Sequence, residues 1–344
     1  MDPLTQGALG AAAAMALAAA DRQRRAFIVG GLAGMAPDLD IAIRSSTDPL
    51  LFLEYHRHFT HALAFVPVGG LLIAGGFGGI DRLARRAPVP FRETLLFATV
   101  GWGTHGLLDA CTSYGTYLYW PFSEARVAWE SISIIDLLVS VPLALGVTVA
   151  VWRRSPMAAR VGLGLALAWL GVGFVQHGRA QALQDRLLAE RGHEPIEATV
   201  KPSFANLVAW RSIYLADGAY HVDGVRPGLF GPGLVYDGAT MPEVRPEDLD
   251  PVLGSDSVAR RDVDRFHHFS MGWIGWHPTD PSLLADVRYA MVPDGTVPLW
   301  GVRIDRARST DLHLDYVQTQ TTPTEEERRR FMDMLMGRGG RVLD

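Results

Sequence analysis

The apolar N-terminal half of this chain is broken by two polar stretches, Pro37-Asp38-Leu39-Asp40 and His56-Arg57-His58-Phe59-Thr60-His61. Together they place two carboxylates and three imidazoles within 24 residues. Charged groups near lipid are costly unless they are paired or bound, so they are rare there and usually functional. Aspartate and histidine are also ligands that zinc and manganese accept. The stretches therefore predict a metal site. The alternative is that the aspartates cap a helix end and the histidines lie at a wet membrane interface.

The apolar runs around these stretches predict membrane-spanning helices. A helix needs about 20 predominantly apolar residues to cross a bilayer, and glycines such as Gly30 and Gly34 allow helices to pack closely. We expect an α-helical membrane bundle of about six apolar helices, which forms a membrane-embedded metal-binding domain over residues 1–177. The runs cover residues 4–20, 26–43, 60–80, 94–110, 132–151 and 161–175.

The composition changes after residue 177. Residues 1–177 carry 13 Arg against 12 Asp and Glu, a net charge of +1, whereas residues 178–344 carry 19 Lys and Arg against 25 Asp and Glu, a net charge of −6. We expect residues 178–344 to form a soluble, mainly β (α+β) domain of unknown role, with a helix over 179–191 and a last helix capped by Thr324. Segments rich in β-branched and aromatic residues predict strands at 194–200, 207–215, 219–225, 268–276, 284–292 and 297–304.

Arginine clusters follow the first, third and fifth apolar runs. Cytoplasmic loops of membrane proteins carry the excess of Lys and Arg. Six spans with these loops inside put both the chain start and residues 178–344 outside the cytoplasm. In the same topology the notable polar residues fall at the outer ends of the runs, which favours one shared site. We therefore expect a multi-pass protein of the cytoplasmic (inner) membrane.

A further pair of polar residues supports a shared site. His105 and Asp109 are four residues apart and lie on one helix face, and Asp136 begins a run at the same expected depth. We expect one to three divalent ions, zinc with manganese as the alternative. The candidate metal ligands are Asp38, Asp40, His56, His61, His105 and Asp109, with His58 as a further candidate.

The sequence resembles the YdjM-like family, described as LexA-binding, inner-membrane-associated, metal-dependent hydrolases. Many members carry His after the threonine at the chain start, whereas Gln6 stands there in this chain, as it does in a subgroup of the family. The resemblance covers about the first 150 residues. The family is remotely similar to zinc-dependent phospholipase C and P1 nuclease, which implies phosphoester hydrolysis as an analogy of fold. The motifs that carry the resemblance are Met1-Asp2-Pro3-Leu4-Thr5-Gln6, Gly34-Met35-Ala36-Pro37-Asp38-Leu39-Asp40, His56-Arg57-His58-Phe59-Thr60-His61, His105-Gly106-Leu107-Leu108-Asp109, and Tyr114-Gly115-Thr116 with Trp120-Pro121.

Several function classes are disfavoured. The single cysteine, Cys111, excludes an intramolecular disulfide and a cysteine-based zinc site. Neither half is basic enough for a nucleic-acid footprint, so we expect no nucleic-acid partner. The chain has no Gly-x-Ser-x-Gly element and no Walker A loop, which argues against a serine hydrolase and a nucleotide-driven pump.

Two functions remain open. The first is a membrane-bound hydrolase that cleaves an ester or phosphoester of an amphiphilic or lipid substrate with metal-activated water. In this interpretation Asp40 bridges two metal ions or orients the attacking water, and Asp136 is an orienting residue or a further metal ligand. Arg57 stabilises negative charge on a phosphoryl oxygen. Its partners are membrane lipid and a small-molecule or lipid substrate, and its protein partners are unknown. The second is a non-enzymatic metal-binding membrane protein that acts as a sensor or scaffold.

Overall fold

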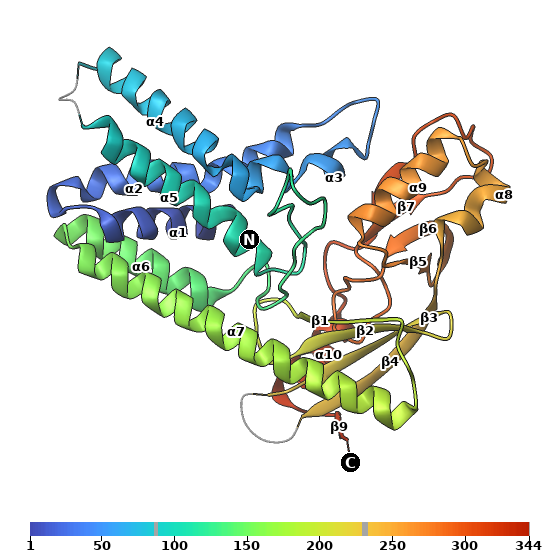
Figure 1. Ribbon diagram of the computed structural model, residues 1–344. Helices are drawn as coiled ribbons and strands as arrows, with labels where there is room; N and C mark the ends of the chain where they lie inside the picture. The colour runs from blue at the N-terminus through green and yellow to red at the C-terminus, as the bar shows by residue number, and fades with distance from the viewer. Residues whose placement is uncertain (86–88, 229–232, 344) are drawn as a thin grey trace. The chain divides into compact units, whose positions relative to one another are not determined.

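The computed structural model describes residues 1–85, 89–228 and 233–343, and the chain divides into two compact units. The first unit is helical and contains Met1–Ala42 and Tyr55–Phe174. The second contains Ile43–Glu54 and Val175–Asp344. The long helix α7 (Pro156–Arg191) continues from one unit into the other (Figure 1). The short segment 43–54 thus belongs to the second unit, although first-unit residues lie on both sides of it in the sequence.

The first unit is built from helices whose ends follow local sequence signals. Asp2 caps α1, because its carboxylate accepts from the Thr5 backbone N–H at 2.9 Å and a proline follows at the first helical position. Asp136 caps α6 in the same way through the Leu138 N–H. The helices are α1 (Pro3–Leu17), α2 (Gln23–Met35), α4 (Val66–Leu83), α5 (Phe91–Ala110) and α6 (Leu137–Arg153), with 3-10 turns η1 (Ala20–Arg22), η2 (Ala36–Ala42), η3 (Phe59–His61) and η4 (Leu63–Phe65).

Glycines bring α1, α2 and α5 into backbone contact, so these helices lie side by side (Figure 1). A Cβ atom at Gly10 of α1 would lie 2.5 Å from the carbonyl oxygen of Gly30 in α2, and a Cβ atom at Gly101 of α5 would lie 2.4 Å from the same oxygen. Such distances admit only glycine. The three helices therefore form the close-packed centre of the first unit.

The expected bundle of about six spanning helices is wrong. Among the described residues only two helices are long and apolar enough to cross a membrane, Leu63–Leu83 and Pro156–Arg191. Helix α1 has 15 residues, which at a rise of about 1.5 Å per residue is shorter than a bilayer core of about 30 Å. Its alanines are buried against other helices. Hydropathy alone does not separate small residues that pack between helices from residues that face lipid.

The second unit contains two antiparallel sheets, which agrees with the α+β layout expected for this part of the chain. One sheet has the strand order β1 (Glu197–Pro202), β2 (Trp210–Ala216), β3 (Ala219–Arg226), β4 (Leu234–Pro242), β9 (Arg341–Val342). The other has β5 (Ile274–His277), β6 (Asp280–Asp286), β7 (Trp300–Arg303) and β8 (Asp315–Gln318). The remaining elements are α3 (Leu51–Tyr55), η5 (Pro246–Leu249), α8 (Asp250–Leu253), α9 (Val258–Phe269) and α10 (Glu325–Met336).

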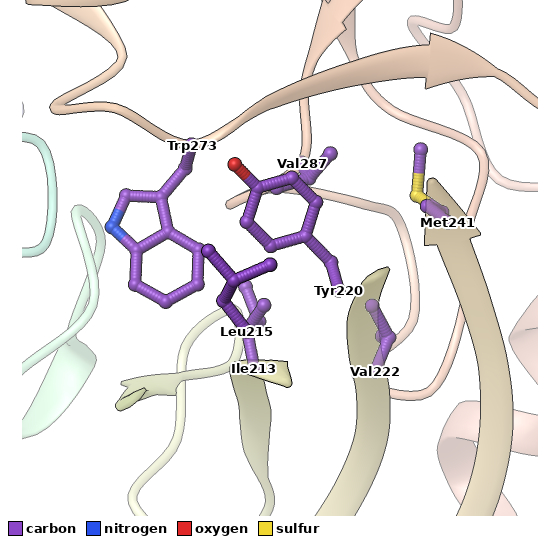
Figure 2. Close-up of a cluster of buried hydrophobic side chains, with 7 residues drawn as sticks. All are labelled: Ile213, Leu215, Tyr220, Val222, Met241, Trp273 and Val287. Carbon is purple, nitrogen blue, oxygen red and sulfur yellow. The ribbon is translucent and has the colours of Figure 1, made fainter. Parts of the chain in front are cut away.

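Helix α9 reaches into the segment where the sequence predicts a strand from residue 268. Ser257 caps it by accepting from the Arg260 N–H, and the strand, β5, begins only at Ile274. The last helix, α10, begins after Thr324 as expected, where Thr324 and Glu327 form a reciprocal capping box. Alternation of side chains along β2 and β3 turns one set inward. Figure 2 shows the resulting apolar cluster of Ile213, Leu215, Tyr220, Val222, Met241, Trp273 and Val287.

Candidate metal centre

Three elements of the first unit bring four potential ligands together. Turn η2 supplies Asp38, turn η3 supplies His61, and one face of α5 supplies both His105 and Asp109. One ligand atom from each residue lies within 4.8 Å of all the others. Asp38 Oδ1 is 3.5 Å from His61 Nε2 and 3.4 Å from His105 Nε2. We refer to these four residues as the quartet.

Hydrogen bonds on the far side of each imidazole fix which nitrogen faces the quartet. His105 Nδ1 lies 2.6 Å from the carbonyl oxygen of Gly34, which can only accept, so this nitrogen carries the hydrogen. His61 Nδ1 lies 3.2 Å from Asp40 Oδ2, which places a hydrogen there too. In the neutral rings both Nε2 atoms therefore present lone pairs to the quartet. A carboxylate or carbonyl behind a histidine is the usual way that a protein orients a metal-binding imidazole.

The acceptor atoms that face one another in the quartet favour a bound cation. The two Nε2 atoms are 2.9 Å apart, although both are acceptors in these tautomers. Asp109 Oδ2 is buried, lies 3.4 Å from His61 Nε2 and faces the Arg57 guanidinium at 3.1 Å. Two imidazole nitrogens and two carboxylate oxygens are a donor set that zinc and manganese accept. The residues present therefore fit a divalent ion.

The electrostatics support the same conclusion. Burial alone would lower the pKa of His61, but hydrogen bonds with Asp109, Asp38 and Asp40 outweigh it and raise the pKa to about 10. Burial alone would raise the pKa of Asp38, but hydrogen bonds with His105 and His61 outweigh it and hold the pKa well below its usual value. The site thus favours a positive charge at His61, which either a proton or a divalent cation can supply.

Gly106 permits this geometry. It follows His105 in α5, and a Cβ atom there would lie 2.1 Å from the carbonyl oxygen of His61. Backbone cannot yield to such an overlap, so a side chain at this position would push η3 away from α5. The glycine therefore sets the distance between His61 and the two ligands on α5.

The structure places Asp40 and His56 around the quartet and not within it. Asp40 is buried and accepts from His56 Nδ1 at 2.9 Å, from the Arg57 N–H at 3.0 Å and from the Thr60 hydroxyl at 2.8 Å, besides its contact with His61. Its position is that of an orienting carboxylate. His56 reaches the centre only through Asp40.

Arg57 approaches the quartet through Asp109. Its Nε lies 3.1 Å from Asp109 Oδ2, Nη1 donates to the Thr112 hydroxyl at 3.1 Å, and the guanidinium carbon sits 4.8 Å from the centre of the Tyr114 ring. The residue is buried and has φ of 63°, a left-handed conformation that is costly for a residue other than glycine. A charged side chain held this way keeps Asp109 ionised.

The other two candidates lie elsewhere in the first unit. Asp136 caps α6, and its carboxylate oxygens accept from the Trp169 indole at 3.0 and 3.1 Å. The His58 ring packs 4.5 Å from that of Tyr117 and 5.7 Å from that of Trp120. Neither residue belongs to the quartet.

Gln6 and Met1 were not among the predicted site residues. The Gln6 amide donates to Asp109 Oδ1 at 2.8 Å, and the Met1 amino group also contacts that oxygen. For Gln6 the sequence signal was the resemblance itself, because many family members carry His at this position.

A second group with ligand chemistry occurs in the second unit, where Asp48, Asp262 and His313 lie close together. Arg265 fills this group. Its guanidinium is 2.8 Å from Asp48 Oδ2 and 2.8 Å from Asp262 Oδ1, and it also contacts Glu54. A cation would have to displace a charge that already satisfies both carboxylates, so we interpret this group as an ion-pair network.

The fold and the site define a protein with a helical unit whose buried histidine and aspartate cluster can hold a metal ion. The comparison with known families agrees: the sequence model described as "YdjM inner membrane protein" matches residues 1–180, more than half of the chain. The chain therefore belongs to the YdjM inner membrane protein family. No curated protein and no solved structure gives a significant match. The family match includes every residue of the quartet.

Proposed function

We propose that this protein is a metal-dependent hydrolase of the inner membrane that cleaves an ester or phosphoester of an amphiphilic substrate. The observation that carries the proposal is the convergence of four acceptor atoms, with the Nε2 atoms of His61 and His105 only 2.9 Å apart. Zinc is the ion that we expect, with manganese as the alternative. A bound divalent ion would act as a Lewis acid and lower the pKa of a water molecule toward about 7.

Each residue has a role that follows from its contacts. Asp38, His61, His105 and Asp109 would hold the ion, and Asp40 orients His61. Arg57 keeps Asp109 charged, and its guanidinium would stabilise negative charge that develops on a substrate oxygen nearby. The contacts of Asp136 lie at the cap of α6, so it has no part in this proposal.

The surroundings of the centre favour an amphiphilic substrate. Asp38 is the quartet member that solvent reaches, since its side chain is 20% exposed while the other three are fully buried. Leu39 and Ile41 on the same turn are 73% and 46% exposed. A substrate that reaches Asp38 meets apolar side chains, which a lipid-like molecule can cover. We extend the proposal to the location: arginines within residues 82–92 lie at and after the end of the first candidate span and those at 153 and 154 precede the second. Because cytoplasmic loops carry the excess of arginine, this favours a second unit outside the cytoplasm, which a reporter fused to the C-terminus tests.

The test is hydrolysis of phospholipid and generic phosphodiester substrates by the detergent-solubilised full chain with zinc or manganese. We expect activity that H61A and D38N abolish and that H277A, a histidine variant in the second unit, retains. Bound metal without activity across a broad ester panel would favour the alternative, a non-enzymatic metal-binding sensor or scaffold. The burial of three ligands supports that alternative, because structural metal sites are closed whereas catalytic ones keep an open position.

A further inference from the structure

The side chain of Gln6 is completely buried beside the quartet, and one of its amide atoms has no hydrogen-bond partner among the residues that the structure describes. Its Nε2 donates to Asp109 Oδ1 at 2.8 Å and to the His105 carbonyl oxygen at 3.3 Å. Both partners are acceptors only. The reversed amide would set its own oxygen against a carboxylate, so the hydrogen-bond network fixes the orientation.

Gln6 Oε1 is consequently the unsatisfied atom. It is buried and accepts no hydrogen bond from the residues that the structure describes. A buried carbonyl without a donor costs about 1–3 kcal/mol, and in a polar pocket a small molecule with an O–H group normally supplies the missing hydrogen. Because Oε1 and Nε2 belong to one amide, and Nε2 donates to Asp109, the unsatisfied oxygen belongs to a group that contacts the quartet directly.

Gln23 provides an internal comparison. It is also completely buried, and its Nε2 donates to the carbonyl oxygens of Met15 and Ala18, both at 2.9 Å. Its Oε1 likewise accepts no hydrogen bond in the described ranges. These contacts hold the end of α1 and involve no charged group. A variant of Gln23 thus reproduces the loss of a buried amide without touching the metal centre.

We propose that Gln6 determines which molecule or ion would bind as a further ligand to a divalent ion held by the quartet. Its Oε1 accepts a hydrogen bond from a neutral molecule with an O–H group, such as water or a substrate hydroxyl. The same lone pair repels an anion that has no hydrogen to donate. This inference rests on the proposed metal centre and adds to it a selection against simple anions, which would otherwise compete with water for a divalent ion.

The probe is azide, an anion without a hydrogen, titrated into the cobalt-loaded full chain in detergent and followed by the visible absorption of cobalt. We compare the wild type with Q6L, which removes the acceptor, with Q6E, which adds negative charge, and with Q23L as the control. We expect Q6L to bind azide about tenfold more tightly, the effect of removing a repulsion on the scale of one hydrogen bond. Q6E should bind azide more weakly than the wild type, and Q23L should match it.

Azide affinity in Q6L that is unchanged or weaker overturns the proposal, because Gln6 would then act only by holding Asp109. If Q6L loses cobalt, the azide affinity of Q6E is compared with that of the wild type. Weaker binding by Q6E then supports the proposal, and equal or tighter binding overturns it. If both variants lose cobalt, Gln6 is needed to keep the ligands in place and the proposal is also overturned. Failure of the wild type to bind stoichiometric cobalt is a separate result, which overturns the metal centre itself.

Discussion

Two clusters in this molecule have the same types of ligand residue, but one is a candidate metal site and the other is an ion-pair network. The quartet in the first unit and the cluster of Asp48, Asp262 and His313 in the second both bring carboxylates and imidazole within coordinating distance. Arg265 satisfies the carboxylates of the second cluster at 2.8 Å. In the quartet the Nε2 atoms of the two imidazoles lie 2.9 Å apart, and among the described residues the arginine contact is one ion pair, between Arg57 and Asp109. The difference teaches that residue type and spacing define a metal site only after the local positive charges are located.

The largest expected effect is loss of the metal. H105A removes one of the two lone pairs and D109N weakens a fully buried carboxylate, so we expect neither variant to retain stoichiometric zinc or manganese. Elemental analysis of the purified chain measures this. H313A alters the second cluster and should keep the wild-type metal content. A wild-type metal content in H105A would remove the distinction between the two clusters.

Removal of Arg265 tests whether this arginine is what makes the second cluster an ion-pair network. R265L removes the arginine from three carboxylates of the second unit, those of Asp48, Glu54 and the buried Asp262, and leaves Asp262 with His313 as its remaining side-chain partner. We expect a destabilisation of about 3 kcal/mol in urea unfolding. R303L, which breaks a half-exposed ion pair in the same unit, should cost less than about 1 kcal/mol. If R265L also gains a divalent ion, the arginine is what separates the two clusters. Equal costs for the two variants would show that the network adds no stability.

The glycine behind the quartet should have a smaller effect. A methyl group at Gly106 overlaps the His61 carbonyl oxygen, so G106A should displace His61 and weaken metal binding by about 10–100-fold, as a disturbed supporting contact does. G103A is the matched control on the same helix, because a Cβ atom there meets the nearest atom, Val66 Cγ1, at 3.5 Å. Competition with a fluorescent zinc chelator measures both affinities. Identical affinities would show that η3 adjusts without moving the ligand.

The smallest expected effect is a loss of stability of the second unit at acidic pH. Burial alone would raise the pKa of Asp48, but the hydrogen bond from Arg265 outweighs it, and the pKa lies below its usual value. A lowered folded-state pKa gives stability that is present above the unfolded value of about 3.9 and is lost as the pH falls below it. We expect the urea midpoint of the second unit to fall between about pH 5 and pH 3, and to fall less in R265L. A parallel decline in both proteins would assign the acid sensitivity to other groups.

The sequence predicts the members of the quartet better than it predicts their environment. His105 and Asp109 are identifiable because helical spacing puts them on one face, and Asp38 and His61 because they interrupt apolar sequence. Arg265 could not be foreseen as the partner of Asp48, since 217 positions separate them. The failure of the six-span expectation has a related cause. The alanines of α1 are buried against other helices, and hydropathy assigns the same value to an alanine that packs on protein and to one that packs on lipid.

Segment 43–54 has a consequence for the order of events during synthesis. Its Phe52 ring packs 5.2 Å from the ring of Tyr316, and its Asp48 pairs with Arg265, which lies 217 residues later in the chain. At about 5–20 residues per second, the ribosome needs about 10–40 s to make that stretch. During this interval segment 43–54 cannot make its contacts with Arg265 and Tyr316. The same segment connects the stretches of chain that carry the ligands Asp38 and His61. A fragment that stops at residue 180, where the family match ends, would never leave this state.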